Sequence, residues 1–272
     1  MKSFALLGHP LGHSLSPLIH ERLMQLAGID GRYTLTDIPP EELPRRMQEL
    51  FALDGFNVTI PYKVDVIDYL DELDDTAKRY MSVNCVAKRD GRTIGYNTDC
   101  VGFIRSMEQA GGRMDGKVLL CGCGGVGRMI AIECMRHGAD LTVMVRPGRE
   151  CTADAAAEYA KAHGHDMRVV TADMITGTYD ALINATAVGM YPNVDASPVT
   201  EDIVRRCGFV YDVIYNPSET LLMRYARENG IPCAGGMAML VMQAAAAEEH
   251  WCGVKFDDTD LDKIVSAMEL IK

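Results

Sequence analysis

The 272-residue sequence has no uncharged apolar run of about 18 residues, the length that a membrane-spanning helix needs. The apolar part of its first residues is also too short for a signal peptide. Basic residues are few, 27 Lys and Arg against 38 Asp and Glu, which makes the net charge −11. So acidic a surface argues against nucleic-acid or anionic-membrane partners. With neither a signal peptide nor a membrane span in view, we expect a cytoplasmic protein.

Paired cysteine motifs are missing as well. The nine cysteines are odd in number and scattered, without one CxxC pair, so buried reduced thiols are expected and a zinc site is not. Repeats and low-complexity tracts are absent. With 48% hydrophobic and 24% charged residues, the composition is that of a globular chain rather than a disordered one. At about 150 residues per domain, the length allows one large domain or two small ones.

Strand-like and helix-like segments alternate along the chain, which predicts an α/β protein with a mainly parallel sheet. Gly111, Gly112 and Gly116 interrupt a helical stretch and mark a break between two α/β runs. Predicted strands span 4–7, 33–38, 55–60, 117–120, 141–145, 181–184 and 210–214, with a hairpin over 82–96 that turns at Asp90-Gly91. Predicted helices span 16–27, 41–53, 125–137, 237–251 and 258–271.

A GxGxxG motif follows one predicted strand and opens a helix. Its residues are Gly122, Cys123, Gly124, Gly125, Val126 and Gly127. The first glycine allows a tight turn, the second lets the backbone approach a pyrophosphate, and the third permits close helix–strand packing. The helix N-terminus adds N–H donors for the phosphates. The surrounding β-α-β pattern favours a dinucleotide site over a purely structural glycine turn.

The end of the next predicted strand discriminates between the two nicotinamide dinucleotides. NAD sites usually have an Asp or Glu there, which binds the ribose 2′-hydroxyl. This chain has Arg146 and Arg149 instead. A guanidinium pairs well with a 2′-phosphate, so NADP(H) is favoured, although two solvated loop arginines are the plainer alternative.

Three polar clusters precede the glycine motif: Ser14-Leu15-Ser16-Pro17, the segment 57–63 and the segment 95–99. Ser16 and Pro17 are typical of a helix start, with Ser16 as the N-cap. Capping alone does not need Ser14, and two hydroxyls at a helix start can hold a carboxylate. In the second cluster, Asn57 and Thr59 share one strand face, and Lys63 lies just beyond the strand end.

Seven segments in order, covering nearly the whole chain, resemble the shikimate dehydrogenase family. They are SLSP at 14–17, NVTIPYK at 57–63, YNTD at 96–99, GCGGVG at 122–127, NATAVGM at 184–190, YDVIY at 211–215 and GGMAMLVMQAA at 235–245. The resemblance implies the reversible reduction of 3-dehydroshikimate to shikimate by NADPH, in the biosynthesis of chorismate and aromatic amino acids.

The resemblance also implies roles for individual residues. Lys63 and Asp99 correspond to the catalytic pair. Substrate-binding residues would be Ser14, Ser16, Thr59, Lys63, Asn84, Asp99, Tyr215 and Gln243. Cofactor-binding residues would be Gly122, Cys123, Gly124, Gly125, Val126, Gly127, Arg146, Val213, Gly236 and Asp75, the last lying in an acidic stretch (65–75) that also fits a solvated face. The chemistry agrees, because hydride delivery to a ketone builds negative charge on oxygen that an ammonium stabilises and protonates.

Some positions depart from the family pattern. Cys85 replaces a usual threonine, which would remove a hydroxyl near the substrate, and Pro147 follows Arg146 where the family usually has threonine. Three alternatives therefore stay open: a quinate/shikimate dehydrogenase that uses NAD or NADP, an aminoshikimate-type relative, and a non-catalytic NADP-binding regulator. A regulator would need neither Lys63 nor Asp99, which argues against it.

The expected fold has two α/β domains with the active site in the cleft between them. Residues 1–103 together with 237–272 would form the substrate domain, and residues 104–236 the Rossmann-type NADP domain. The assignment of the last segment depends on Gln243, which must reach the N-terminal substrate site. A monomer or a homodimer is expected, with shikimate or 3-dehydroshikimate as the small-molecule partner.

Overall fold

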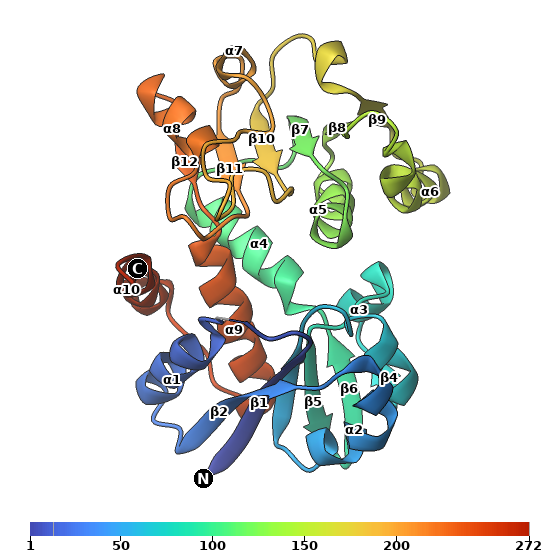
Figure 1. Ribbon diagram of the computed structural model, residues 1–272, viewed down its shortest axis with the longest axis vertical. Coiled ribbons are helices and arrows are strands. Elements are labelled where there is room, and N and C mark those ends of the chain that lie inside the picture. Colours follow the sequence, from blue (N-terminus) through green and yellow to red (C-terminus); the bar gives the residue numbers. More distant parts are fainter. Residues whose placement is uncertain (13, 272) are drawn as a thin grey trace. The chain divides into compact units, whose positions relative to one another are not determined.

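The computed structural model describes residues 1–12 and 14–271, and it divides into two compact units (Figure 1). The discontinuous unit comprises Met1–Gly102 and Val241–Lys272, and the central unit comprises Phe103–Leu240. The expected boundaries near residues 103 and 237 fall in helices α4 (Thr98–Gln109) and α9 (Met237–Cys252), through which the chain passes between the units.

The discontinuous unit contains a six-stranded sheet with the order β2-β1-β3-β5-β6-β4. Its strands are β1 (Lys2–Gly8), β2 (Gly31–Asp37), β3 (Gly55–Val58), β4 (Glu72–Leu73), β5 (Cys85–Arg89) and β6 (Arg92–Tyr96). Only β5 runs against its neighbours; the other pairings are parallel. Asp90 and Gly91 turn the β5–β6 hairpin with positive φ angles of 51° and 78°, as a two-residue turn of this kind requires.

Apolar clusters cover both faces of this sheet. On β1, Ala5 and Leu7 face a cluster that includes Met47, whereas Phe4 points the other way and stacks on Trp251 with ring centroids 4.7 Å apart. This alternation follows from the two-residue period of a strand. The helices are α1 (Ser16–Leu26), α2 (Leu43–Phe51), α3 (Asp75–Tyr80), the first turn of α4, most of α9, and α10 (Asp258–Glu269), with short 3-10 turns at Pro40–Glu42 and Asp65–Tyr69.

The central unit is built on a second sheet, whose strands are all parallel and follow the order β12-β11-β10-β7-β8-β9. The strands are β7 (Lys117–Cys121), β8 (Asp140–Met144), β9 (Met167–Val170), β10 (Ala181–Asn184), β11 (Val210–Asp212) and β12 (Cys233–Ala234). The helices are α5 (Gly125–Arg136), α6 (Asp154–His163), α7 (Glu201–Val204) and α8 (Leu221–Glu228), with 3-10 turns at Glu150–Ala153 and Ala172–Met174. This strand order defines a doubly wound sheet, and it reverses between β7 and β10.

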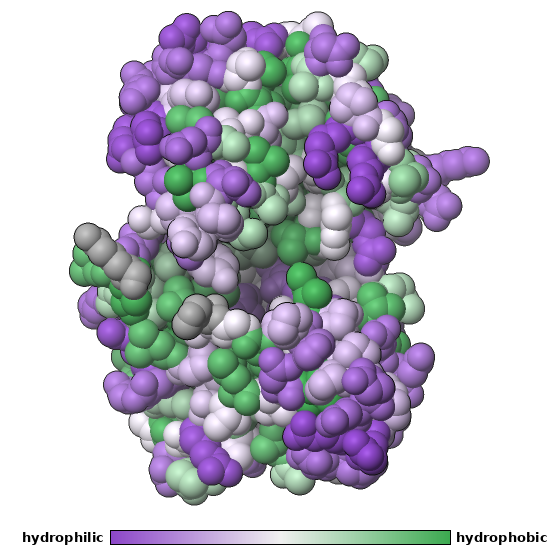
Figure 2. Space-filling model, viewed as in Figure 1, coloured by the Kyte–Doolittle hydropathy of each residue, from purple (hydrophilic) through white to green (hydrophobic). Residues whose placement is uncertain are grey.

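The surface carries both hydrophilic and apolar residues. On the face shown in Figure 2, hydrophilic residues cover much of each unit, with apolar residues scattered among them. Within residues 1–12 and 14–271, no helix has the length and apolar character required to cross a membrane. All nine cysteines are free, and six of them are buried.

Candidate functional site

Strand topology gathers four polar segments at one edge of the discontinuous unit's sheet, the edge formed by the ends of its strands. The segments after β1 and β3 leave the carboxyl ends of neighbouring parallel strands, where Leu7 pairs with Val58. Because β5 is antiparallel, its first residue, Cys85, lies beside Asn57 at that same edge. The hairpin then returns the end of β6 to this edge, since Cys85 also pairs with Tyr96. Residues far apart in the sequence therefore meet at the strand ends.

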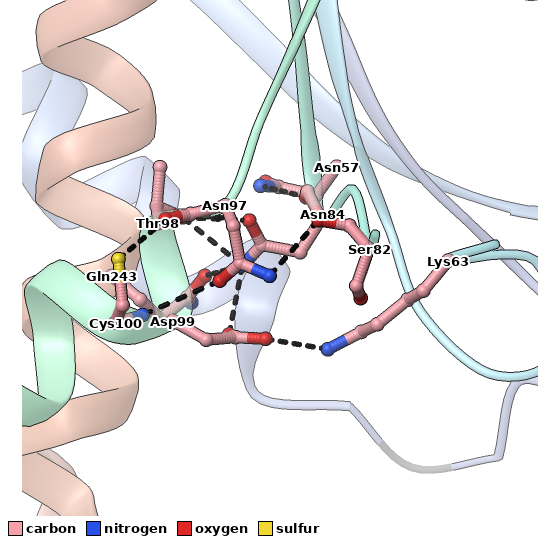
Figure 3. Close-up of polar contacts among 9 residues, drawn as sticks. All are labelled: Asn57, Lys63, Ser82, Asn84, Asn97, Thr98, Asp99, Cys100 and Gln243. Atoms are coloured by element: carbon pink, nitrogen blue, oxygen red, sulfur yellow. Dashed lines mark hydrogen bonds and ion pairs between the residues drawn. The ribbon is translucent and has the colours of Figure 1, made fainter. Parts of the chain in front are cut away.

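At this edge Lys63 and Asp99 form an ion pair, with Nζ and Oδ2 2.6 Å apart (Figure 3). Asp99 lies in the first turn of α4, where the helix dipole favours a carboxylate. Its other oxygen, Oδ1, accepts a hydrogen bond of 2.8 Å from the Asn84 amide. The two paired side chains are 25% and 17% exposed, so the ion pair is partly shielded and still reachable from solvent.

Asn84 is the centre of the surrounding hydrogen bonds. Its Nδ2 also lies 3.1 Å from Thr98 Oγ1 and 3.5 Å from Gln243 Oε1, on α9. Its Oδ1 accepts from the Thr98 backbone N–H at 2.6 Å, which satisfies a donor at the start of α4. The structure therefore brings together the predicted residues Lys63, Asn84, Asp99 and Gln243 (Figure 3).

The serine cluster follows β1, and the structure changes one expectation about it. Helix α1 begins at Ser16 itself, so Ser16 is not the N-cap, and Leu15 in that position makes no side-chain cap hydrogen bond. Instead Ser14 Oγ accepts from the Ser16 N–H at 3.2 Å. The segment directly after β1 is held by Asp37, which accepts from the Leu11 N–H at 2.7 Å and pairs with His9.

Thr59 lies next to the start of that segment. Its N–H donates to Leu7 O at 2.8 Å, and a Cβ added at Gly8 would come within 2.6 Å of the Thr59 methyl group. The structure therefore keeps Thr59 and the end of β1 in contact. A side chain at position 8 would displace the methyl groups of Leu11 and Thr59, so glycine suits this close approach.

Cys85 does not line this group of polar residues. Its side chain is fully buried in the apolar cluster that contains Phe4, Tyr96 and Trp251. Burial raises the pKa of the Cys85 thiol well above its usual value, with smaller contributions from the charges of Glu248 and other carboxylates. The replacement of threonine therefore changes the packing beneath the site, which differs from the loss of a substrate-facing hydroxyl that we expected.

The glycine motif lies in the central unit, between β7 and α5, at the point where the strand order reverses. Gly122 has a φ of +86°, and a Cβ at Gly127 would come within 2.3 Å of Gly122 O. In contrast, Cβ atoms at Gly124 and Gly125 would meet nothing within 4 Å. A tight turn, close helix packing and open space above the loop are the features that a bound pyrophosphate requires, so these residues fit a dinucleotide.

The other predicted cofactor residues lie in several separate segments of the chain. Arg146 is exposed in the loop that follows β8. Val213 and Gly236 lie together, because the Gly236 N–H donates to Ile214 O at 3.0 Å and a Cβ at Gly236 would come within 2.0 Å of Val213 O. Tyr215, expected to bind substrate, belongs to this unit and is 38% exposed. Asp75 belongs to the discontinuous unit and is exposed at the start of α3.

Our sequence interpretation missed a buried carboxylate at the carboxyl edge of the central sheet. Asp212 is fully buried at the end of β11 and accepts hydrogen bonds from Thr220 Oγ1 (2.7 Å), Asn184 Nδ2 (3.0 Å) and the Ile214 N–H (3.1 Å). Burial raises its pKa to about 6, although these three donors oppose the shift. Two quoted motifs, NATAVGM and YDVIY, contain Asn184 and Asp212, and an Asp that directly ends an apolar strand was the available signal.

No metal centre is formed by the described residues: none of them build a group of three or more His, Cys, Asp or Glu side chains suited to a metal ion. The arrangement supports acid–base chemistry at Lys63 and Asp99 in the discontinuous unit, and dinucleotide binding at the glycine loop of the central unit.

A doubly wound sheet with a glycine loop and a separate lysine–aspartate site define the class, a nicotinamide-nucleotide-dependent dehydrogenase. A family model described as "Shikimate dehydrogenase substrate binding domain" matches residues 6–86. The NADP(+) shikimate dehydrogenase of Shouchella clausii is 39% identical, covering 97% of this chain and 98% of the relative. The corresponding protein of Caldanaerobacter subterraneus is 41% identical, over 94% and 93%. The chain belongs to the shikimate dehydrogenase family.

A solved structure agrees with this assignment. The shikimate 5-dehydrogenase of Thermus thermophilus, in complex with NADP(H) and shikimate, superposes with a TM-score of 0.86 at 32% identity, covering 98% of this chain and 99% of that chain. The family and the mixed α/β fold expected from the motifs are confirmed. The roles of individual residues stay predictions.

Proposed function

We propose that this protein is an NADP-dependent shikimate dehydrogenase, which interconverts 3-dehydroshikimate and shikimate in aromatic amino-acid biosynthesis. The observation that carries the proposal is the Lys63–Asp99 ion pair, supported by Asn84 at the edge of the discontinuous unit's sheet. The reaction and the cofactor are supported by family membership, and by similarity to relatives that are named as NADP(+) enzymes and are matched over almost their full length.

In this proposal Lys63 performs the acid–base step. Bound NADPH supplies a hydride to the substrate carbonyl carbon, and the Lys63 ammonium stabilises the charge that develops on oxygen and donates a proton to it. Asp99 holds the ammonium by the 2.6 Å contact and accepts a hydrogen bond from a ring hydroxyl. In the oxidative direction the same lysine accepts the hydroxyl proton.

The remaining predicted residues bind and orient the ligands. Ser14 and Ser16 would hold the substrate carboxylate, helped by Tyr215, while Thr59, Asn84 and Gln243 would bind ring hydroxyls. The glycine loop would hold the cofactor pyrophosphate through backbone N–H groups, and Arg146 would pair with the 2′-phosphate. We also propose that the protein is cytoplasmic and works as a monomer or a homodimer.

A steady-state assay of the purified protein tests the function. Shikimate and quinate are each offered with NADP and with NAD, and nicotinamide reduction is followed by absorbance. We expect the highest kcat/KM for shikimate with NADP. Faster turnover of quinate with NAD would favour the quinate/shikimate dehydrogenase alternative. No turnover, together with NADP binding in calorimetry, would favour the regulator.

Changing Arg146 to alanine tests how the cofactor is selected. The KM for NADP should rise about 10-fold, the order expected for a lost charge-assisted contact, while the KM for NAD stays unchanged. Arg113→Ala, which removes an exposed arginine of the same unit, is the control and should change neither value. An equal loss with NAD would mean that Arg146 does not recognise the 2′-phosphate.

A further inference from the structure

Asn57, which the motifs singled out without assigning it a role, connects two parts of the discontinuous unit. It is 5% exposed near the end of β3. Its Nδ2 donates to the Asn84 backbone carbonyl at 3.0 Å, and its Oδ1 accepts from the Tyr33 hydroxyl at 2.8 Å. Because a carbonyl can only accept, these two partners determine the orientation of the Asn57 amide.

The ring of Tyr33 is held in place by a stacked histidine. Its ring, on β2, stacks on His20 with centroids 4.0 Å apart and planes 8° from parallel. His20 Nδ1 lies 2.8 Å from Glu248 Oε1, and both side chains are fully buried. Burial raises the pKa of Tyr33 well above its usual value, with further increases from Cys85 and Glu248, so the hydroxyl stays protonated and donates.

The hydrogen bonds form one continuous path from Tyr33 to the ion pair of Lys63 and Asp99. Tyr33 donates to Asn57, Asn57 donates to the backbone of Asn84, and the Asn84 side chain donates to Asp99. The Asn84 carbonyl also accepts from the Val58 N–H at 2.9 Å, so the strand pairing persists without Asn57. Loss of the Asn57 side chain would therefore remove one of the two hydrogen bonds to the Asn84 carbonyl and leave the strand pairing in place.

We propose that Tyr33 and Asn57 are positioning residues for the dehydrogenase reaction, which hold Asn84 so that its amide orients Asp99 toward Lys63. This inference rests on the proposed function, since its effect is seen on shikimate. Neither residue would touch the substrate. Each acts through Asn84, which in turn aligns the carboxylate and the ammonium, and small displacements of such groups have large effects on rate.

A double-mutant cycle in the 272-residue protein tests the inference. Tyr33→Phe removes only the hydroxyl and keeps the ring on His20, and Asn57→Ala removes the bridging amide. We expect the KM for shikimate to rise about 5-fold in Tyr33→Phe and about 10-fold in Asn57→Ala, with lower kcat and an unchanged KM for NADP. The double variant should match Asn57→Ala, because Tyr33 acts only through that amide.

Tyr62→Phe is the matched control in the same unit: its buried hydroxyl donates to the backbone oxygen of Ile38, whereas that of Tyr33 donates to the side-chain oxygen of Asn57. It should lower the melting temperature about as much as Tyr33→Phe does and leave both KM values unchanged. A loss of folded protein alone would lower apparent kcat and move neither KM. If Asn57→Ala does not fold, Tyr33→Phe against this control still decides.

The outcomes separate the two proposals. If Tyr33→Phe turns over shikimate with the kcat and KM values of wild type, the positioning role is overturned and the proposed function stands. If the fold-changes in KM of the two single variants multiply in the double variant, the two residues act independently, and the path through Asn57 is overturned. A wild-type protein inactive on shikimate would overturn the proposed function, and the inference with it.

Discussion

Lys63→Ala is expected to lower kcat for shikimate oxidation by about 10²-fold or more, the contribution typical of a positioned acid–base group. The variant loses the ammonium that lies 2.6 Å from Asp99 and would exchange a proton with the reacting oxygen. The fold should be kept, because Asp99 remains partly exposed and retains its hydrogen bond from Asn84. Steady-state kinetics with saturating NADP measure the loss, and circular dichroism reports the fold.

Lys78→Ala is the control for this substitution, since Lys78 is an exposed lysine on α3 in the same unit. It removes one positive charge from the unit and should leave kcat unchanged. An unchanged kcat in Lys63→Ala would contradict the acid–base role of Lys63. A high concentration of a small primary amine should restore part of the activity of Lys63→Ala if only the proton-transferring group is missing.

The location of the candidate site could be predicted because short motifs mark each of its segments. The paired residues Lys63 and Asp99 are 36 positions apart, and no local pattern places them in contact. The family resemblance identified them, and the sheet explains how they meet, since β3 and β6 end at the same edge on either side of the antiparallel β5.

Elements with a weak burial pattern escaped prediction. Strand β9 lies at the edge of its sheet, with Arg168 and Val169 exposed, so neither alternation nor an apolar run marks it. Helix α6 buries only alanines, Ala156 and Ala160, which gives its sequence little contrast between faces. By comparison, all four residues of β10 are buried, and its apolar run was recognised.

The contacts that hold Tyr33 and Asn57 could not be predicted either. The contact of Tyr33 with Asn57 joins residues 24 positions apart, and that of His20 with Glu248 joins residues 228 apart. Such pairs depend on how strands and helices pack, which periodicity does not report. Cys85 shows the same limit, because its neighbour in the motif, Asn84, faces the site while the thiol points into the apolar cluster.

Asp212→Asn is expected to stabilise the protein at neutral and alkaline pH. Burial raises the pKa of Asp212 to about 6, whereas an unfolded chain holds an aspartate near 3.9. Between these values the native state binds more protons than the unfolded state, so the contribution of Asp212 to stability falls as the pH rises. From pH 4 to pH 8 that loss amounts to about 2 kcal/mol, and an asparagine avoids it.

The hydrogen-bond geometry allows this replacement. An asparagine oxygen can accept from Asn184 and the Ile214 N–H as Asp212 Oδ1 does. Its amide can donate to Thr220 Oγ1, which also accepts from the Met223 N–H, so the Thr220 hydroxyl proton loses its acceptor and part of the gain is offset. Urea unfolding of both proteins from pH 4 to pH 8 measures the difference, and Asp202→Asn, at an exposed position, reports what losing one surface carboxylate does over that range. A stability difference between Asp212→Asn and wild type that stays constant with pH, once this control is subtracted, would show that the pKa of Asp212 in the native state equals its value in the unfolded chain. Its three donors would then fully offset the cost of burying the charge, and the expected gain from the asparagine would be absent.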